Sequence, residues 1–254
     1  MSFLQLLEIE FIKVKRSRIM PLLLIAPLLV VTSGVANLSR YFTPEYTNAW
    51  PAMFIQSALI YAYYLLPISM IVVSVMLFSR ETGNNGTLKM LSLPVSRYAL
   101  SAAKFCMLVF FLLLEILIFL LDFVIAGIAA TKTMGVTETM PILYLFKWCA
   151  GLFFTMLPGL GVIWAITVLS EKLLVSVGLN MFLVLPGILI ANTSLWVVYP
   201  YCYSGYLVSC SLHDFTRETN TAGFPLFPVL PVAILIFMLS VTISVTQFGK
   251  KEMR

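Results

Sequence analysis

Two carboxyl residues stand inside a long apolar run of the sequence. Glu115 and Asp122 interrupt the segment CMLVFFLLLEILIFLLDFVIAG and, being seven residues apart, share one face of a helix. A charge near the centre of a bilayer costs at least about 2.5 kcal/mol, so such residues normally face a cavity, a partner or water. We interpret both as candidates for lining a transport pathway. The alternatives are a protonated, hydrogen-bonded structural role for Glu115 and simple snorkelling to the nearer membrane surface for Asp122.

The other reactive residue types do not form a catalytic centre. The single histidine, His213, has no cysteine or acid at a metal-ligand spacing such as His-x-x-x-His or Cys-x-x-Cys. The sequence holds no Gly-x-Ser-x-Gly elbow and no Gly-x-x-x-x-Gly-Lys-Ser/Thr run to cradle phosphates. We therefore expect no catalytic residue, no metal and no cofactor in this chain, and not an enzyme.

The composition indicates a membrane protein. Of 254 residues, 61% are apolar and 11% are charged, whereas about a quarter of a soluble domain is charged. A helix crosses the hydrocarbon core with about 20 apolar residues. Six runs reach that length, at approximately 19–37, 52–79, 100–130, 143–169, 173–197 and 226–247. Because an open sheet edge is not tolerated in lipid, we predict an all-α integral membrane fold with six transmembrane helices.

The basic residues predict the orientation of these spans. With six spans, both termini lie on the same side, and that side receives twelve of the 16 Lys and Arg residues. Since basic loops stay in the cytoplasm, we predict cytoplasmic termini, a transmembrane domain over 19–247 and a cytoplasmic tail over 248–254. The net charge of +5 thus reflects topology, and we expect no nucleic-acid partner.

Residues 1–18 are predicted to form an interfacial helix on the cytoplasmic side. Its apolar stripe consists of Phe3, Leu4, Leu7, Phe11 and Val14. Basic residues follow the stripe, a pattern typical of an amphipathic helix that lies in the membrane surface near anionic headgroups. An ordinary basic tail is the alternative reading.

The loop between the second and third spans, residues 80–97, is also distinctive. Gly83-Asn84-Asn85-Gly86 has turn chemistry, since Gly and Asn tolerate positive φ. Thr87 can cap a short helix from Leu88 to Leu93, and Pro94 stops it. The pattern predicts a short helix that runs across the membrane surface between two spans.

At these residues the sequence resembles a known family. The pattern Glu81, then Gly86-Thr87-Leu88-Lys89, then Leu91, then Pro94-Val95-Ser96-Arg97, then Lys104 is similar to the cytoplasmic loop of type-2 ABC exporter permeases. Within them it is most similar to the lantibiotic-immunity permeases, which protect Gram-positive bacteria from antimicrobial peptides. The six spans and the segment Glu-x-x-Lys-x-Lys-Arg-Ser (Glu10 to Ser17) fit the same resemblance. Only the loop is specific, because the spans match in hydropathy and order alone.

The resemblance implies that the loop is a coupling helix, which seats in a groove of a separate cytoplasmic ATPase and passes its closure to the spans. The implied coupling residues are Glu81, Gly86, Thr87, Leu88, Leu91, Pro94 and Arg97. ATP and Mg would be bound by the partner, an ATP-binding subunit dimer. A six-span subunit supplies half a pathway, so we also expect a second permease subunit, either a different chain or a copy. The implied cargo is a lantibiotic-type cationic peptide, and the implied location is the plasma membrane of a Gram-positive bacterium.

The segment between the last two spans, residues 198–225, is too long for a simple turn. It is rich in Tyr at first and then aqueous. The resemblance suggests short helices that dip into the outer leaflet, where a peptide could be met, and a packed extracellular cap is the alternative. Cys202 and Cys210 lie eight residues apart in this segment, a spacing that permits an extracellular disulfide without establishing its geometry.

Three functions are compatible with these residues. The first is the permease of an ABC transporter that expels lantibiotic-type peptides and confers immunity. The second is a proton-coupled secondary transporter that uses Glu115 and Asp122, and the third is an immunity protein that sequesters a peptide without transport. The loop favours the first function, because coupling residues would be needless in the other two.

Overall fold

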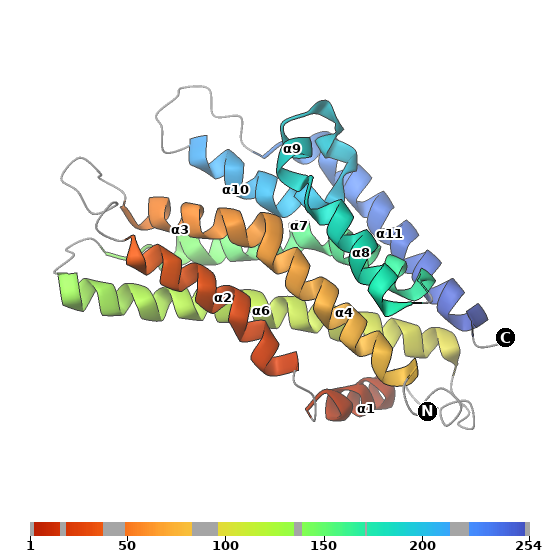
Figure 1. The fold of residues 1–254 in the computed structure, drawn as a ribbon. Helices are drawn as coiled ribbons and strands as arrows, with labels where there is room; N and C mark the ends of the chain where they lie inside the picture. Colours follow the sequence, from red (N-terminus) through yellow and green to blue (C-terminus); the bar gives the residue numbers. More distant parts are fainter. Residues whose placement is uncertain are drawn as a thin grey trace.

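The computed structural model describes residues 3–15, 19–37, 49–82, 96–134, 139–170, 172–213 and 224–251. In these residues every regular element is helical, and six spans are long and apolar enough to cross a membrane. Figure 1 shows both chain termini at the same end of the helix bundle, as an even number of spans requires. The chain is therefore an all-α integral membrane protein, as predicted.

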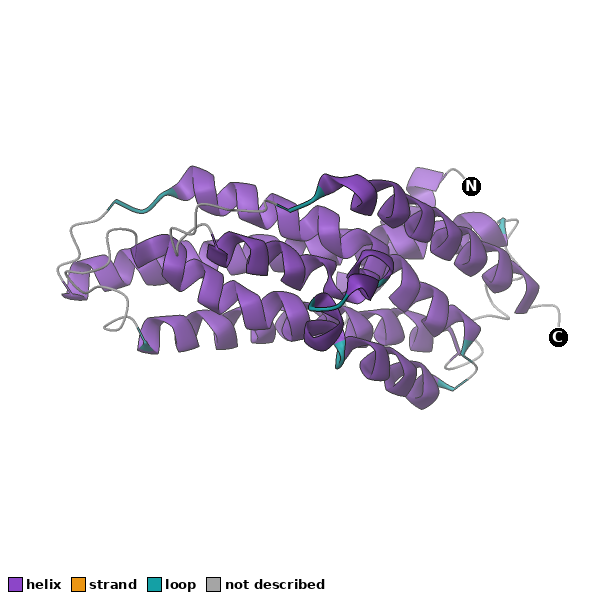
Figure 2. Ribbon diagram, turned by 90° about the horizontal axis from the view of Figure 1, so that it is seen from above, coloured by secondary structure: helices purple, strands orange, loops and turns teal. Residues whose placement is uncertain are grey.

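The helices follow the predicted spans closely. They are α1 (Phe3–Lys15), α2 (Ile19–Ala36), α3 (Ala49–Ile60), α4 (Leu66–Thr82), α6 (Arg97–Met134), α7 (Ile142–Leu169), α8 (Leu173–Val184), α9 (Gly187–Ala191), α10 (Tyr203–His213) and α11 (Leu226–Lys251). A π-helical turn, Tyr61–Leu65, joins α3 to α4, and two 3-10 turns, Ser194–Val198 and Pro200–Cys202, precede α10. Figure 2 shows how short the described connections between these helices are.

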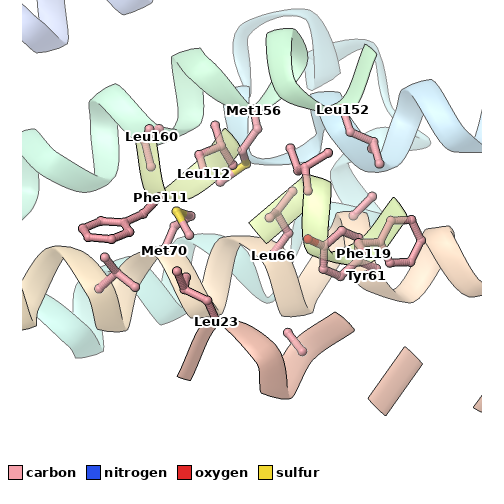
Figure 3. Close-up of a cluster of buried hydrophobic side chains, with 14 of the residues drawn as sticks. Leu23, Tyr61, Leu66, Met70, Phe111, Leu112, Phe119, Leu152, Met156 and Leu160 are labelled. Carbon is pink, nitrogen blue, oxygen red and sulfur yellow. The ribbon is translucent and has the colours of Figure 1, made fainter. Parts of the chain in front are cut away.

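The core lies between α2, the second span, α6 and α7. Apolar side chains from these four elements meet in the cluster of Figure 3, and Tyr61 stacks on Phe119 with ring centroids 4.5 Å apart. The central element is α6, whose 38 residues make a rod about 57 Å long at 1.5 Å per residue. It packs against α1, α2, α4, α7 and α11, so a displacement of α6 reaches most of the bundle.

A proline explains the π-helical turn in the second span. Pro67 has no N–H, so it cannot donate to the preceding turn of the helix. The N–H of Leu66 reaches back five residues to the carbonyl of Tyr61, which is the π-helical pattern. The carbonyl of Ala62 accepts instead from the Ser204 hydroxyl at 2.9 Å, and this bond fastens α10 to the second span.

The predicted N-terminal helix forms as α1, but it presents a different face to the bundle than the apolar stripe indicated. Leu6, Glu10 and Val14 are the buried positions, whereas Leu4 is 75% exposed and Phe11 45% exposed. These three buried residues are spaced by four, as one face of a helix requires. Val14 is therefore the one residue of the predicted stripe that the bundle buries, and the buried face of α1 also carries the charge of Glu10.

The fifth span is shorter than its apolar run. The sequence predicts a helix over 173–197, but α8 ends at Val184, two residues before Pro186, and α9 runs only from Gly187 to Ala191. Proline removes a helical hydrogen bond and clashes with the preceding turn, which accounts for the break. The chain then turns back toward α8 through the two 3-10 turns before α10 begins.

Candidate functional site

A buried ion pair joins α1 to α6. The Nζ atom of Lys104 lies 3.0 Å from Oε2 of Glu10, and Nζ of Lys13 lies 2.6 Å from Oε1. Glu10 and Lys104 are 2% and 1% exposed, while the side chain of Lys13 keeps 37% exposure. Each carboxylate oxygen therefore has its own ammonium donor, the arrangement that a buried charge needs.

Electrostatics keeps Glu10 ionised in this position. Burial alone would raise the pKa of its carboxyl, but the charges and hydrogen bonds of Lys104 and Lys13 outweigh burial and hold the pKa below its ordinary value. Sequence reasoning named Glu10 and Lys104 separately, as parts of one resemblance, and did not pair them. The signal that could have paired them is that each is a charged residue at a position whose helical neighbours are apolar.

Glu115 is enclosed between α4 and α6. Its carboxyl is fully buried, and both of its oxygens lie 2.7 Å from the hydroxyl oxygen of Ser69. The same hydroxyl oxygen is 2.8 Å from the carbonyl of Leu66. This is the helix-to-helix contact weighed as the structural alternative for Glu115, and the structure gives it no opening onto a cavity among the described residues.

Asp122 lies two turns further along α6 in a different setting. It is half-buried, and its Oδ2 atom is buried without a hydrogen-bond partner in the described part of the chain. Buried polar atoms normally have a partner, so Asp122 has an unmet hydrogen-bonding capacity that Glu115 lacks. The two acids are thus chemically distinct despite sharing a helix face.

A second polar connection crosses the bundle between α4, α7 and α8. The hydroxyl of Thr167 lies 3.1 Å from those of Ser74 and Ser176. One turn along α8, Asn180 accepts from the Tyr201 hydroxyl at 2.9 Å. The hydroxyls of Ser74 and Thr167 also lie 2.8 Å from carbonyls of their own helices, and together these contacts tie the short fifth span to its neighbours.

Comparison with known proteins identifies the family. The family model described as ABC-2 family transporter protein matches residues 6–187, which is well over half of the chain. The chain belongs to the ABC-2 transporter family. No curated protein gives a significant match. The matched stretch begins inside α1 and ends in α9, so it contains the Glu10–Lys104 pair, Glu115 and the polar connection through Thr167.

Membership makes this ABC-2 protein a membrane subunit of an ABC transporter, a type of subunit that works with an ATP-binding partner. The predicted coupling surface falls largely outside the described residues: Gly86, Thr87, Leu88, Leu91 and Pro94 all do. Glu81 lies in the last turn of α4 and Arg97 is the first residue of α6. The structure therefore locates the two ends of the loop at the same end of the bundle as α1.

The segment after α9 in this ABC-2 protein re-enters the bundle. The Tyr199 hydroxyl donates to the carbonyl of Leu183, and Gly205 packs against the ring of Tyr63. Tyr63 also lies within hydrogen-bond distance, 3.2 Å, of Ser209. Short helices between the last two spans were predicted, and their anchoring on α8 and on the π-helical turn is what the sequence did not reveal.

The suggested disulfide in this segment is not formed in the structure. Cys202 ends the 3-10 turn just before α10 and is buried, with its thiol 3.0 Å from the carbonyl of Tyr199, whereas Cys210 lies within α10. Helical geometry separates residues eight apart by about 12 Å, and a disulfide needs Cα atoms within about 7 Å. An eight-residue spacing permits a bridge only where the chain folds back, and here it continues as a helix.

Proposed function

We propose that this ABC-2 permease, driven by a separate ATPase, expels lantibiotic-type cationic peptides from the plasma membrane of a Gram-positive bacterium and so confers immunity. The observation that carries the ATPase-driven part is the buried Glu10–Lys104 pair. It fastens α1 to α6 two turns after α6 begins, directly beyond the loop of residues 80–97. A force applied to that loop would therefore move α1 and α6 together.

The peptide part of the proposal rests on three features. The loop resembles that of lantibiotic-immunity permeases more than that of other type-2 exporters. The half-buried Asp122 has a carboxylate oxygen without a hydrogen-bond partner in the described part of the chain. The tyrosine-rich segment from Tyr199 to Tyr206 lies between the last two spans, on the side that the basic residues predict to be extracellular.

We further propose that a second permease subunit completes the pathway. The fifth and sixth spans bury only 22% and 11% of their most apolar windows inside this chain, against 56% for the second span. Lipid covers part of that surface. A second permease packed on it would place the polar connection of α8 near a shared pathway.

Affinity purification tests the ATPase assignment. The chain is tagged at its C-terminus, membranes are solubilised gently, and co-purifying proteins are identified by mass spectrometry. We expect a subunit that carries a Walker A sequence, lost on the double change Leu88→Asp and Leu91→Asp and retained on Leu88→Met and Leu91→Met. Recovery of the same subunit with both double variants at equal yield would refute the coupling assignment.

Growth in the presence of a lantibiotic tests the cargo. Cells that express the intact system should tolerate at least about tenfold more peptide than cells with the Asp double variant, with equal amounts of permease in the membrane. Protection that survives loss of the ATPase would instead favour a sequestering immunity protein.

A further inference from the structure

The hydroxyl of Ser69 touches two groups at the contact between α4 and α6, and its protons can be counted. Its Oγ atom lies 2.7 Å from each carboxyl oxygen of Glu115 and 2.8 Å from the carbonyl oxygen of Leu66. All of these distances are typical of O–H···O hydrogen bonds. A serine hydroxyl has one proton to donate. It therefore cannot supply hydrogen bonds to the carboxyl and to the carbonyl by itself.

A proton on Glu115 satisfies this count. A neutral carboxyl donates one O–H, here to the Ser69 oxygen, and Ser69 then donates its own proton to the carbonyl of Leu66. The second carboxyl oxygen is close because it belongs to the same planar group. With an ionised carboxylate, Ser69 would have one proton for two acceptor groups, and one of the two would contact its oxygen without a hydrogen bond.

The surroundings of Glu115 also favour a neutral carboxyl. The side chain is fully buried, and an isolated buried charge is very costly unless a partner compensates it. Among the described residues, Ser69 is the hydrogen-bond partner of Glu115, and no cation forms an ion pair with it. The buried Glu10 differs on this point, because Lys104 and Lys13 compensate its charge.

Few titratable groups of the described chain share the interior with Glu115. The hydroxyl of Tyr61, on the π-helical turn, lies within electrostatic range of Glu115 and of Cys149 on α7. The α2 helix has no titratable residue, and those of α4 and α11 stand in the last turns of these helices. The charges of α1 meet the beginning of α6 at Lys104, and Asp122 lies two turns further along α6. Tyr61 is thus the hydroxyl donor that can answer a change of charge on Glu115.

The Tyr61 hydroxyl is an unused donor beside this carboxyl. The Tyr61 ring stacks on Phe119 (Figure 3), with ring centroids 4.5 Å apart, and Phe119 follows Glu115 by one turn on the same helix face. The Tyr61 side chain is fully buried, and its hydroxyl has no hydrogen-bond partner in the described chain. A buried donor without a partner is costly, and a carboxylate accepts about twice as strongly as a neutral group. An ionised Glu115 would therefore attract this hydroxyl.

We propose that the α4–α6 contact is a pH-sensitive switch, in which Glu115 carries a proton in the present state and accepts from both Ser69 and Tyr61 once that proton is lost. The proton leaves the carboxyl for bulk water. Ser69 then turns its hydroxyl from the Leu66 carbonyl to the carboxylate, and Tyr61 becomes the second donor. The switch is independent of the proposed function, because neither an ATPase nor a peptide takes part in it.

The switch acts on the span that leads to the loop of residues 80–97. Ser69 lies on α4, which continues to Thr82, whereas Tyr61 begins the π-helical turn on the side of α3. In the neutral state Glu115 is bonded to α4 alone, and in the ionised state it is bonded to both sides of the turn. Alkaline pH should therefore tie the two halves of the second span together.

Infrared difference spectroscopy tests the proton. The full chain is purified with its co-purifying subunits, placed in nanodiscs and compared with Glu115→Gln at neutral pH. We expect the parent to show the carbonyl stretch of a protonated carboxyl that Glu115→Gln lacks. Glu8→Gln, the same change at an exposed acid of α1, should keep that stretch. Carboxylate bands of Glu115 in its place would overturn the proposal.

A second variant keeps the acid in place and covers the case in which Glu115→Gln fails to fold. Ser69→Ala removes the acceptor of the acid proton, so it should shift the frequency of the protonated-carboxyl stretch at neutral pH. A stretch with the same frequency in Ser69→Ala and in the parent would contradict the proton count.

A pH titration of the same band tests Tyr61. As the pH rises, the stretch should disappear and the carboxylate bands of Glu115 should appear. Tyr61→Phe keeps the ring on Phe119 and removes the second donor, so it should raise the pH of half-loss by about one unit, because a hydrogen bond to a charged group is worth at least about a tenfold change. Tyr64→Phe, on the same turn, should leave that pH unchanged. An unchanged pH of half-loss in Tyr61→Phe, or a stretch that persists until the protein unfolds, would overturn the switch.

Discussion

The Glu10–Lys104 pair allows a stability prediction whose size follows from burial. The change is Glu10→Gln, which keeps the shape of the side chain and removes its charge. Lys104 then loses this carboxylate while its side chain stays only 2% exposed, and breaking such a buried pair costs about 3–5 kcal/mol. Lys13 loses the same partner but is 37% exposed, so its ion pair adds little.

The assay is thermal unfolding of the purified complex in detergent. At roughly 2–4 °C per kcal/mol for a chain of this size, Glu10→Gln should lower the apparent Tm by at least about 6 °C. Adding Lys104→Met removes the buried positive charge and should restore more than half of the loss, because a neutral pair of similar volume is tolerated. The control is Lys132→Met, at an exposed position of α6, which should shift the Tm by less than about 1 °C. A double variant that is less stable than Glu10→Gln alone would refute the reasoning.

Three further outcomes are expected. Glu115→Gln should preserve protection against peptide in growth assays, because an amide keeps the 2.7 Å contact with Ser69; a loss of protection at normal protein level would favour a proton-coupled carrier. Gly205→Ala should lower the Tm, because its Cβ would overlap the ring of Tyr63 and overpacking costs about 1–3 kcal/mol. The control Gly178→Ala, whose Cβ meets nothing within 4 Å, should be neutral or stabilising. Folding lowers the pKa of Glu10, so its ionised carboxyl adds its full contribution to the free energy of unfolding above the ordinary pKa of about 4.3. That contribution is lost as the pH falls through the lowered pKa. Unfolding scans should therefore show a steeper decrease of Tm below about pH 4.3 for the parent protein than for Glu10→Gln.

The sequence predicted the spans because hydropathy over about 20 residues reports directly on the cost of crossing lipid. It indicates a weak point in the fifth span, where Pro186 interrupts the apolar run, but it did not predict the π-helical turn of the second span. Pro67 is the visible cause of that turn, but a proline in a membrane helix can be absorbed by neighbouring groups. Whether it bends, breaks or bulges the helix depends on a partner such as Ser204, which is 142 residues from Ala62.

The candidate site was only partly predictable for a related reason. The acids of the third span stand out in any apolar run, so Glu115 and Asp122 were found. Their roles depend on which neighbour each one meets, and that neighbour comes from another helix. Ser57 is buried and its hydroxyl has no hydrogen-bond partner within the described chain, and this has no signal in the sequence, because serine in a membrane span normally bonds to its own backbone.

The π-helical turn at Tyr61–Leu65 has a consequence for the second span as a whole. A turn that holds one extra residue takes up about 100°, the angle that one residue occupies in an α-helix, so α3 and α4 keep the facing of a regular helix that is one residue shorter. In this arrangement Ser57 lies against Gly34 of α2 and Ser69 lies against Glu115 of α6. Deleting one residue from the turn would straighten the span and keep both contacts. Restoring α-helical hydrogen bonds at the present length would instead turn one half of the span against the other by about 100° and break one of the two contacts.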